Sequence, residues 1–303
     1  MRLPRSAHPG NLKVIELVRG RSPALLGLGM LALLAGIAAG APWLASGDPF
    51  AISGDALVPP GRAHLFGSDD LGRDVFAGVV HGTATSLIVG LAAAALSAAI
   101  GVAVGGLAGV GRGAIDLALM RATEFAQALP RFFLVITLVS LFGGKLLFIV
   151  AALGLTAWPA TARMLRAQTQ SIMERDFVAA ARAAGSSDAA ILARHVLPLA
   201  LPVLAAQISY QAGGAILAEA GLSFLGLGDP SVMSWGTQLG SAQYFVREAW
   251  WMALFPGLAV TITVVACNLV ADGLGEGGVR SAWRPRWDFG AAASAAMPRT
   301  PQS

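Results

Sequence analysis

Charged side chains are scarce in this sequence: Asp, Glu, Lys and Arg make up 13% of its 303 residues, whereas 55% are hydrophobic. Soluble domains carry about 25% charged residues. The mean hydropathy of +0.67 is high for the same reason. The composition therefore argues against a soluble protein and predicts an all-α polytopic membrane protein.

Cysteine is also nearly absent. The single cysteine, Cys267, lies in a hydrophobic run, which excludes a disulfide framework and a thiolate metal cluster. We expect it to be a small buried side chain. The net charge of +4 would suggest a nucleic-acid partner in a soluble protein. Here the basic residues lie between the hydrophobic runs, where membrane topology explains them, so nucleic acid is not supported as a partner.

Motifs for enzyme chemistry are missing as well. A phosphate-binding loop needs a glycine five residues before its Gly-Lys pair, but Val139 stands there before Gly144-Lys145. Ser223 lacks the second glycine of a hydrolase nucleophile elbow, because Gly226 comes one residue too late. The histidines are scattered along the chain: His8, His64, His81 and His195. We therefore expect a chain that is not an enzyme and holds no metal or cofactor of its own.

Six hydrophobic runs are each long enough to cross a bilayer. They cover residues 23–44, 83–109, 115–141, 146–167, 199–222 and 250–271. Basic residues dominate segment 1–22 and the tail 275–303, which predicts that both are cytoplasmic, whereas loop 45–82 is mainly acidic and is predicted to lie outside. The first run is too long for a typical signal-peptide core, so we expect a retained span.

Loop 168–198 contains a polar interval that predicts a small helical knob between two spans. Residues 176–184 are strong helix formers, and Gly185 is placed to end that helix. A second short helix is expected over residues 189–196, and Pro198 should end it.

Capping and charge support the same knob. Ser187 or Asp188 is well placed to cap the second helix. The basic residues of the loop include Arg175, Arg182 and Arg194. This charge bias independently predicts that the knob lies in the cytoplasm.

The knob resembles the cytoplasmic EAA loop of ABC importer permeases, the membrane subunits that dock onto separate ATPase subunits. The family pattern is Glu-Ala-Ala, three residues, Gly, nine residues, an apolar position, one residue and Leu-Pro. The residues that fall on it are Ala180, Ala181, Gly185, Leu197 and Pro198. Two positions depart, because Ala179 replaces the glutamate and His195 an aliphatic residue. We expect Asp176 to supply part of the missing acidity.

Two further segments resemble one branch of this family, the peptide/nickel type. The first is HLFGSDDLGRDVF, residues 64–76; the second is EAGLSFLGLG, residues 219–228, followed by Ser-Trp-Gly at 234–236. The external residues expected on the binding-protein side are Asp69, Asp70, Arg73, Asp74 and Trp235. Without the resemblance, the simpler interpretation of the first segment is a solvated loop closed by a local Asp–Arg pair.

Glycines, aromatic residues and a few charges interrupt the spans. The glycines Gly101, Gly105, Gly109 and Gly113 recur every four residues and predict close helix packing. Trp250-Trp251 predicts an aromatic anchor at the membrane interface. Arg121 and Glu124 are spaced to pair across one helical turn. Beyond a kink expected at Pro130, two interpretations of Arg131 stay open: it lines a solvated path, or it pairs with Glu219.

The resemblance implies an ABC type I importer permease, with six transmembrane helices and a core domain over residues 83–274, in the bacterial inner membrane. It implies a second homologous permease as a heterodimer partner, two ATP-binding-cassette ATPase subunits below and an external solute-binding protein above. ATP and Mg would then bind on the partner subunits. The residues expected to contact the ATPase are Asp176, Ala180, Ala181, Arg182, Gly185, Ser187, Asp188, Leu197 and Pro198.

Substrate and mechanism leave alternatives. The branch transports di- and oligopeptides, nickel and related small solutes, and peptides are favoured because they are its commoner substrate. A different class would be a secondary carrier or channel with Arg121, Glu124, Arg131 and Glu219 as its ion relay. Few acidic residues lie deep in the spans and no inverted repeat is evident, so the importer permease is preferred.

Overall fold

The computed structural model describes the backbone of residues 9–111 and 113–282, and the side chains of residues 23–111 and 113–275. Within these ranges the chain is α-helical, and β pairing is limited to two isolated bridges. The helices are α1 Pro9–Leu44, α2 Val75–Gly111, α3 Gly113–Ala126, α4 Arg131–Phe142, α5 Leu146–Met173, α6 Asp176–Ala183, α7 Asp188–Ile191, α8 Leu197–Phe224, α9 Trp235–Ala242 and α10 Trp251–Ala282. The predicted all-α fold is confirmed.

The predicted terminal segments fall partly inside α1 and α10. Helix α1 begins at Pro9, and α10 runs to Ala282, beyond the end at residue 271 that hydropathy indicates. The remainder of those two segments, residues 1–8 and 283–303, lies outside the described residues.

Five helical stretches are long and apolar enough to cross a membrane. They are Pro23–Leu44, Val75–Gly111, Leu146–Met173, Asp188–Phe224 and Trp251–Gly275. Helices α3 and α4 make a sixth candidate only if they are counted together, because they meet at a bend of 74°. The expected kink is thus a break: Pro130 has no amide hydrogen and disfavours helical backbone in the residue before it, so α3 ends at Ala126 and α4 begins at Arg131.

The predicted glycine face lies between α2 and α5. A β-carbon added at each glycine would approach α5 within 3 Å, so the two helices are in direct backbone contact. The pairs are Gly101 with Thr161, Gly105 with Ala162, and Gly109 with Thr169. The packing role is confirmed for these three glycines. Gly113 differs, because it has a φ of +58° and belongs to the turn that starts α3.

A buried glutamine connects the central helices. The side chain of Gln211 on α8 accepts a hydrogen bond from Ser97 Oγ of α2 at 2.8 Å. Its amide nitrogen donates to Thr161 Oγ1 and to the Ala157 carbonyl of α5, at 2.9 and 3.2 Å. One side chain thus joins three helices with every polar group paired, as a buried amide requires.

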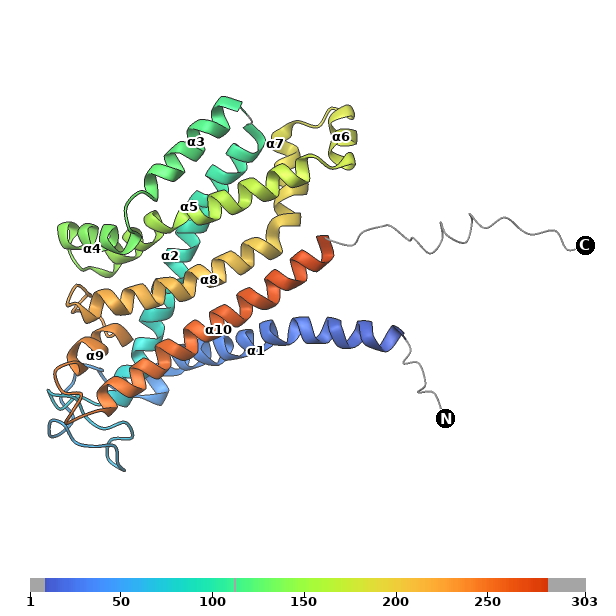
Figure 1. The fold of residues 1–303 in the computed structure, drawn as a ribbon. Helices are drawn as coiled ribbons and strands as arrows, with labels where there is room; N and C mark the ends of the chain where they lie inside the picture. Colours follow the sequence, from blue (N-terminus) through green and yellow to red (C-terminus); the bar gives the residue numbers. More distant parts are fainter. Residues whose placement is uncertain (1–8, 112, 283–303) are drawn as a thin grey trace, which may run out of the picture.

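The helix expected to stop at Pro198 does not stop there. Helix α7 passes through a π-helical turn, Leu192–Val196, directly into α8, so the backbone stays helical from Asp188 to Phe224. Pro198 occupies the first turn of α8. A proline inside a helix clashes with the carbonyl four residues earlier, and the wider π turn at that point accommodates it. In Figure 1 the chain turns at this point, which is where a proline or a π turn bends a helix.

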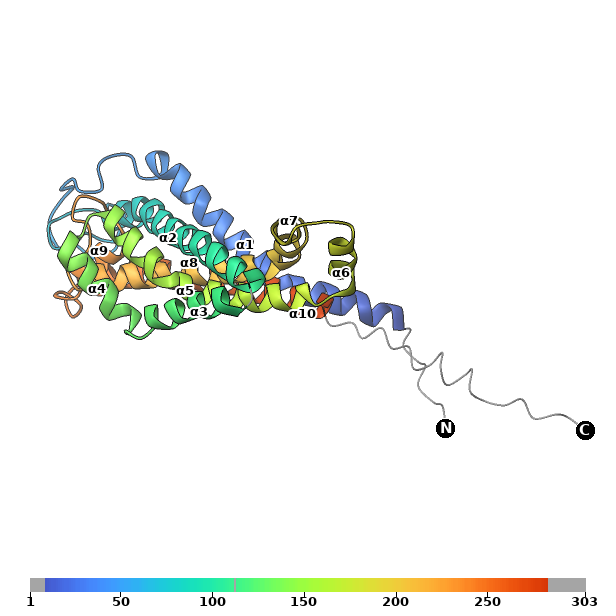
Figure 2. The same ribbon diagram turned by 90° about the horizontal axis from the view of Figure 1, so that it is seen from above.

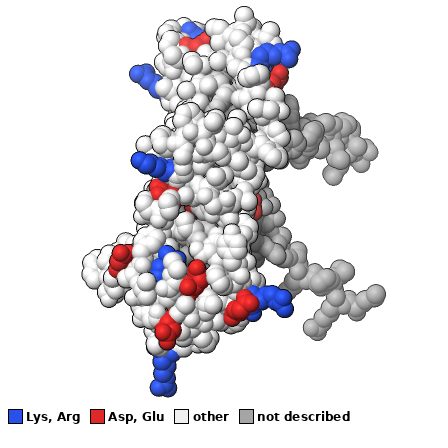
Figure 3. Space-filling model, turned by 90° about the vertical axis from the view of Figure 1, so that its left-hand side faces the viewer, with Lys and Arg blue, Asp and Glu red and all other residues white. Residues whose placement is uncertain are grey.

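The molecule is elongated, with different structures at its two ends (Figures 1 and 2). Helices α6 and α7 project at one end, close to the start of α1 and the end of α10. The connection 45–74 and α9 lie at the other end. Figure 3 views this second end: most of its face is uncharged, and charged side chains gather in its lower part, where Figure 1 places the 45–74 connection. That the chain's described ends lie on the knob side fits the predicted topology.

Candidate functional site

The knob is held to the bundle by a small apolar cluster. Helix α6 has one fully buried side chain, Val178. The cluster around it comprises Ile172 and Met173 of α5, Ile191 of α7 and Val196 of the π turn. The anchor of α6 is therefore supplied by the end of α5, by α7 and by the π turn that leads into α8.

The elbow after α6 is a glycine-ended helix terminus, as the sequence predicts. Gly185 has a φ of +87°, in the left-handed region that favours glycine. The Ser186 amide donates to the Ala181 carbonyl at 3.0 Å, and the Gly185 amide donates to Arg182 at 2.9 Å. These two bonds form a Schellman motif, which satisfies carbonyls at the end of a helix.

Two side chains then fix α7 against α6. Ser187 is the N-cap of α7, and its hydroxyl accepts a hydrogen bond from the Ala190 amide at 3.3 Å. This settles the cap as Ser187, not Asp188. Asp188 instead accepts a 2.9 Å hydrogen bond from Arg182 Nε across the elbow. The ion pair is largely exposed, so it orients the two helices more than it stabilises them.

Most of the knob surface is available to a partner, but two predicted contact residues are not. Along 174–187 only Val178 is buried, and Ala181 is half-buried in the same cluster. Leu197 is also half-buried, because it packs against α5 and against its own helix α8. Phe177 is exposed and lies edge-on to His195, with ring centroids 6.0 Å apart. The sequence analysis did not include Phe177 among the expected contact residues. The available signal was an aromatic residue in an otherwise polar helical segment.

The four ionisable residues predicted in the spans do not gather into one relay. Arg121 and Glu124 pair with each other at 3.1 Å, as predicted, on an exposed face of α3. Arg131 donates to the Leu153 carbonyl at 3.2 Å and to Thr156 Oγ1 at 3.4 Å, both on α5.

Glu219 has partners of its own on α8 and α9. Its Oε1 accepts hydrogen bonds from Ser223 at 2.8 Å and from Ser234 at 2.9 Å. Among the described residues, the predicted pair of Arg131 with Glu219 is therefore absent, because each is bound to other groups. These bonds join the segment 219–228 to the segment 234–236, both noted in the sequence. Ser234 is also the N-cap of α9.

An ion pair that the sequence analysis missed joins α3 to α5. Arg166 donates through two nitrogens to the two carboxylate oxygens of Asp116, each at 2.5 Å, and Gln170 adds a longer bond. The sequence signal that could have predicted this pair is one acidic and one basic residue, each in a mostly apolar segment. The two residues are 50 positions apart in the sequence, so spacing alone does not connect them.

At the opposite end, Asp69 and Arg73 form the predicted local pair. The Arg73 Nε lies 2.6 Å from Asp69 Oδ2, and Asp69 Oδ1 accepts the amides of Leu71 and Arg73. Asp74 accepts the Phe76 amide at 2.8 Å at the start of α2, as an N-capping residue does. These acidic side chains therefore shape the turn into α2, while Asp70 has no such role.

Two tryptophans expected at surfaces are buried. Trp235 is fully buried, and its indole donates to the Val79 carbonyl at 3.0 Å, so it cannot face a binding protein. Trp251 is buried as well and donates to the Ser68 carbonyl at 3.0 Å, so only Trp250 is exposed as an interface anchor would be. Both indoles connect helices to distant backbone, a use of tryptophan that hydropathy does not reveal.

Asp229 fastens the loop after α8 to the start of α5. Its carboxylate accepts the Leu146 amide at 2.8 Å and the Ser231 amide and hydroxyl at 3.0 and 2.6 Å. Partial burial alone would raise the pKa of Asp229, but these hydrogen bonds and nearby Lys145 outweigh it and hold the pKa below its usual value. No group of three or more His, Cys, Asp or Glu side chains in the described part of the chain is arranged to hold a metal ion.

Comparison with known proteins agrees with this architecture. The model of the family described as binding-protein-dependent transport system inner membrane component matches residues 101–277, more than half of the chain. The chain belongs to this family. It is therefore a multi-pass inner-membrane permease, the transport subunit of a system that also includes ATPase and solute-binding partners. The matched region contains α5, the knob and α8.

The permease is also similar over most of its length to curated relatives. A Brucella suis protein provisionally named as a peptide transport system permease is 40% identical over 268 residues, covering 88% of this chain and 90% of the relative. The di/tripeptide transport system permease protein DppC of Pseudomonas aeruginosa is 36% identical over 259 residues, covering 83% and 86%. A provisionally named peptide permease of Brucella ovis is 35% identical over 288 residues, covering 94% and 93%.

Proposed function

We propose that this permease moves di- or oligopeptides inward across the membrane after an external solute-binding protein delivers them. The peptide assignment rests on relatives that are named as peptide or di/tripeptide transport permeases and are similar over more than four-fifths of the chain. Nickel or another small solute of the same branch is the alternative substrate.

The knob carries the proposed energy input. It is exposed over most of its surface, yet its single buried anchor ties it to α5 and to the π turn that leads into α8. A partner that grips the knob would therefore displace two spans together. We infer that ATPase subunits dock here, with Asp176, Ala180, Arg182, Ser187 and Asp188 at the contact and Gly185 setting the elbow angle.

We further propose that a second, homologous permease completes the path. Exposed apolar side chains on α3, on α4 and in the turn between them provide the surface for it, including Phe125, Leu129, Phe132 and Phe133. Two inequivalent permeases would give a heterodimer above two ATPase subunits. The carrier or channel alternative is weakened, because its four relay residues are engaged in three separate sets of contacts.

Affinity purification of the full-length permease from its native membrane in mild detergent tests the proposal. We expect a second permease and ATPase subunits in stoichiometric amounts, and ATP-dependent uptake of a dipeptide after reconstitution with the solute-binding protein. A chain that purifies alone and transports without ATP would instead identify a secondary carrier.

A further inference from the structure

A pocket of about 630 Å³ opens at the end of the bundle opposite the knob. Most of its lining comes from three parts of the chain: the turn that leads into α2, the loop between α8 and α9, and α9 itself. Its size lies within the range of pockets that enclose a small ligand. None of the residues that the permease is expected to use for ATPase docking lines this pocket.

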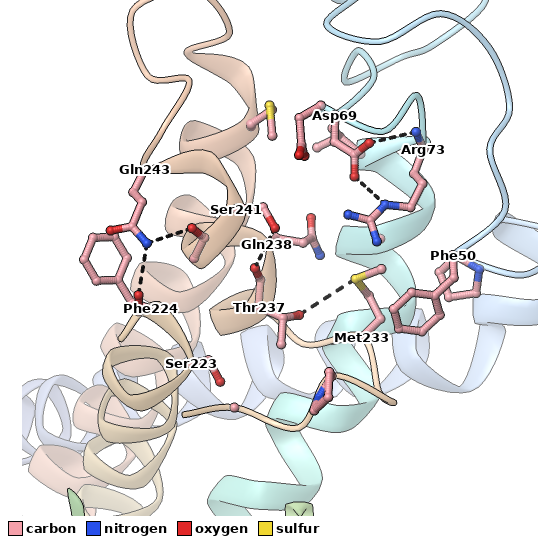
Figure 4. A pocket seen from close by; sticks show the side chains of 18 of the residues that line it. Phe50, Asp69, Arg73, Ser223, Phe224, Met233, Thr237, Gln238, Ser241 and Gln243 are labelled. Atoms are coloured by element: carbon pink, nitrogen blue, oxygen red, sulfur yellow. Dashed lines mark hydrogen bonds and ion pairs between the residues drawn. The ribbon is translucent and has the colours of Figure 1, made fainter. Parts of the chain in front are cut away.

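The pocket contains an amide group without hydrogen-bond partners. Both the Nε2 and the Oε1 of Gln238 on α9 are inaccessible to solvent and unpaired. Figure 4 shows this side chain extending from α9 toward the Asp69–Arg73 pair. The amide lies against Gly78 of α2, where an added β-carbon would be 3.1 Å from its Cδ and Nε2. A glycine at that position leaves the space that the amide occupies.

An unpaired carboxylate oxygen accompanies the amide. Asp70 also lines the pocket, and its Oδ1 is buried without a hydrogen-bond partner. Its neighbour Asp69 is already neutralised by Arg73 at 2.6 Å. Burial, and next the negative charge of Asp69, raise the pKa of Asp70. Arg73 acts on Asp70 only at longer range, so a cationic group in the pocket would find a carboxylate that has no direct ion-pair partner among the described residues.

Unpaired buried polar groups are costly, at about 1–3 kcal/mol each. Three such atoms around one cavity indicate a site that a polar molecule fills. Because these atoms are buried, a ligand satisfies them when the Gln238 and Asp70 side chains turn toward it. The remaining walls are mixed in character, and their apolar part includes Phe50, Val75, Phe224, Met233 and Met252.

We propose that this pocket binds the amino-terminal end of a short peptide, with Gln238 pairing to a peptide group and Asp70 to the α-ammonium. A primary amide offers one donor and one acceptor side by side, which complements a backbone peptide unit. The carboxylate selects for positive charge, and the apolar wall receives a hydrophobic side chain. The proposal rests on the proposed peptide substrate and adds a receiving site on the permease itself.

Equilibrium dialysis of radiolabelled Ala-Phe against the full-length permease, purified with its native partners in lipid nanodiscs and without the solute-binding protein, tests the site. Wild type should bind saturably with one site per permease. Gln238→Leu should weaken binding at least about tenfold, equivalent to about 1.4 kcal/mol. The melting temperature of this variant should not fall, because leucine removes unpaired polar atoms from a buried position. A purely structural role for Gln238 predicts the opposite, a loss of stability.

Gln243→Leu is the matched control. Gln243 lines the same pocket, but its amide nitrogen already donates to Phe224 and Gly240 carbonyls, at 3.2 and 2.9 Å. We expect unchanged peptide binding in this variant. Gly78→Ala provides a second probe from the opposite wall, since its methyl group would displace the Gln238 amide and should weaken binding as Gln238→Leu does.

Acetylation of the peptide tests the carboxylate. N-acetyl-Ala-Phe should bind wild type at least about tenfold more weakly than Ala-Phe. In Asp70→Asn the two peptides should bind alike, because the carboxylate that distinguishes them is gone. Absence of saturable binding to wild type up to about 1 mM, or equal affinities of wild type and Gln238→Leu, would overturn the proposal.

The solute-binding protein provides the remaining outcome. If the Gln238 and Asp70 variants weaken docking of that protein while wild type binds no peptide, the pocket receives a protein side chain and the peptide site is refuted. This result is distinct from failure of the proposed function, which co-purification and ATP-dependent uptake measure separately.

Discussion

The two ends of the permease are held together by contacts of very different range. At the knob, the hydrogen bonds join residues at most six positions apart, such as Arg182 with Asp188. At the opposite end, Trp251 and Ser68 are 183 residues apart, and Trp235 and Val79 are 156 apart. The knob is therefore a local unit that can move as one body, whereas the other end fixes α2, α8, α9 and α10 relative to one another.

This difference predicts that damage at the two ends has different consequences. At the opposite end a lost contact should lower the stability of the whole bundle. At the knob a lost contact should leave the bundle folded and interrupt the transfer of motion from the ATPase. Four measurements can break or sharpen this contrast.

The largest effect is expected for Glu219→Ala. The substitution leaves the buried Ser223 and Ser234 hydroxyls without their acceptor and opens a cavity, so we expect a loss of about 3 kcal/mol in the free energy of unfolding. Thermal unfolding in nanodiscs measures it. Glu219→Gln is the control, since its carbonyl can still accept both bonds, and it should lose much less. Equal melting temperatures for wild type and Glu219→Ala would contradict the idea that contacts at the end opposite the knob stabilise the whole bundle.

The next effect is at the elbow. In Gly185→Val a β-branched side chain is forced to a φ of +87°, which costs about 1–2 kcal/mol and changes the angle between α6 and α7. We expect dipeptide uptake to fall about tenfold while ATP hydrolysis continues, and the melting temperature to fall less than in Glu219→Ala. Gly185→Asn should retain most uptake, because asparagine tolerates left-handed backbone. Normal uptake by Gly185→Val would refute the knob as a lever.

A double-mutant cycle distinguishes the predicted ion pair from the observed one. Arg131 and Glu219 share no partner, so Arg131→Gln and Glu219→Gln should be additive in unfolding free energy within about 0.5 kcal/mol. The same cycle for Asp116→Asn and Arg166→Gln should give a coupling of about 0.5–3 kcal/mol. Coupling in the first cycle but not in the second would show that the charged side chains are paired differently.

The smallest effect concerns acidity. The pKa of Asp229 is lowered in the folded protein, so its stabilisation is present above the ordinary pKa of about 3.8 and is lost as the pH falls further through the folded value. Because Asp229 is partly exposed, we expect less than about 1 kcal/mol. Asp229→Asn should remove this contribution at pH 7 and flatten the acid end of the stability profile. An unchanged profile would show that the bond to Leu146 does not contribute.

Features that depend on neighbouring residues were predictable from the sequence. Gly185 was recognised because few other residues adopt a positive φ, and the helix cap was narrowed to Ser187 or Asp188, of which the structure shows Ser187. The pairs Asp69–Arg73 and Arg121–Glu124 likewise lie within one or two turns. In each case the interaction partner is specified by spacing alone.

Features that depend on packing were not. Pro198 was expected to stop a helix, but a π turn whose formation depends on the tertiary position of α8 lets the helix continue. Trp235 was expected at the surface that faces the binding protein. Only the folded structure shows that its indole N–H donates to the Val79 carbonyl. Gln238 carried no sequence signal, because an unpaired amide can be recognised only when its surroundings are known.

The Gln211 side chain has a mechanical consequence. The knob is continuous with α8 on one side and nearly continuous with α5 on the other, so a force on the knob would reach both helices. Gln211 holds α8 to Ala157 and Thr161 of α5 and to Ser97 of α2. Sliding α8 along α5 would have to break these bonds together. Gln211 therefore favours movement of α5 and α8 as one unit when the knob moves.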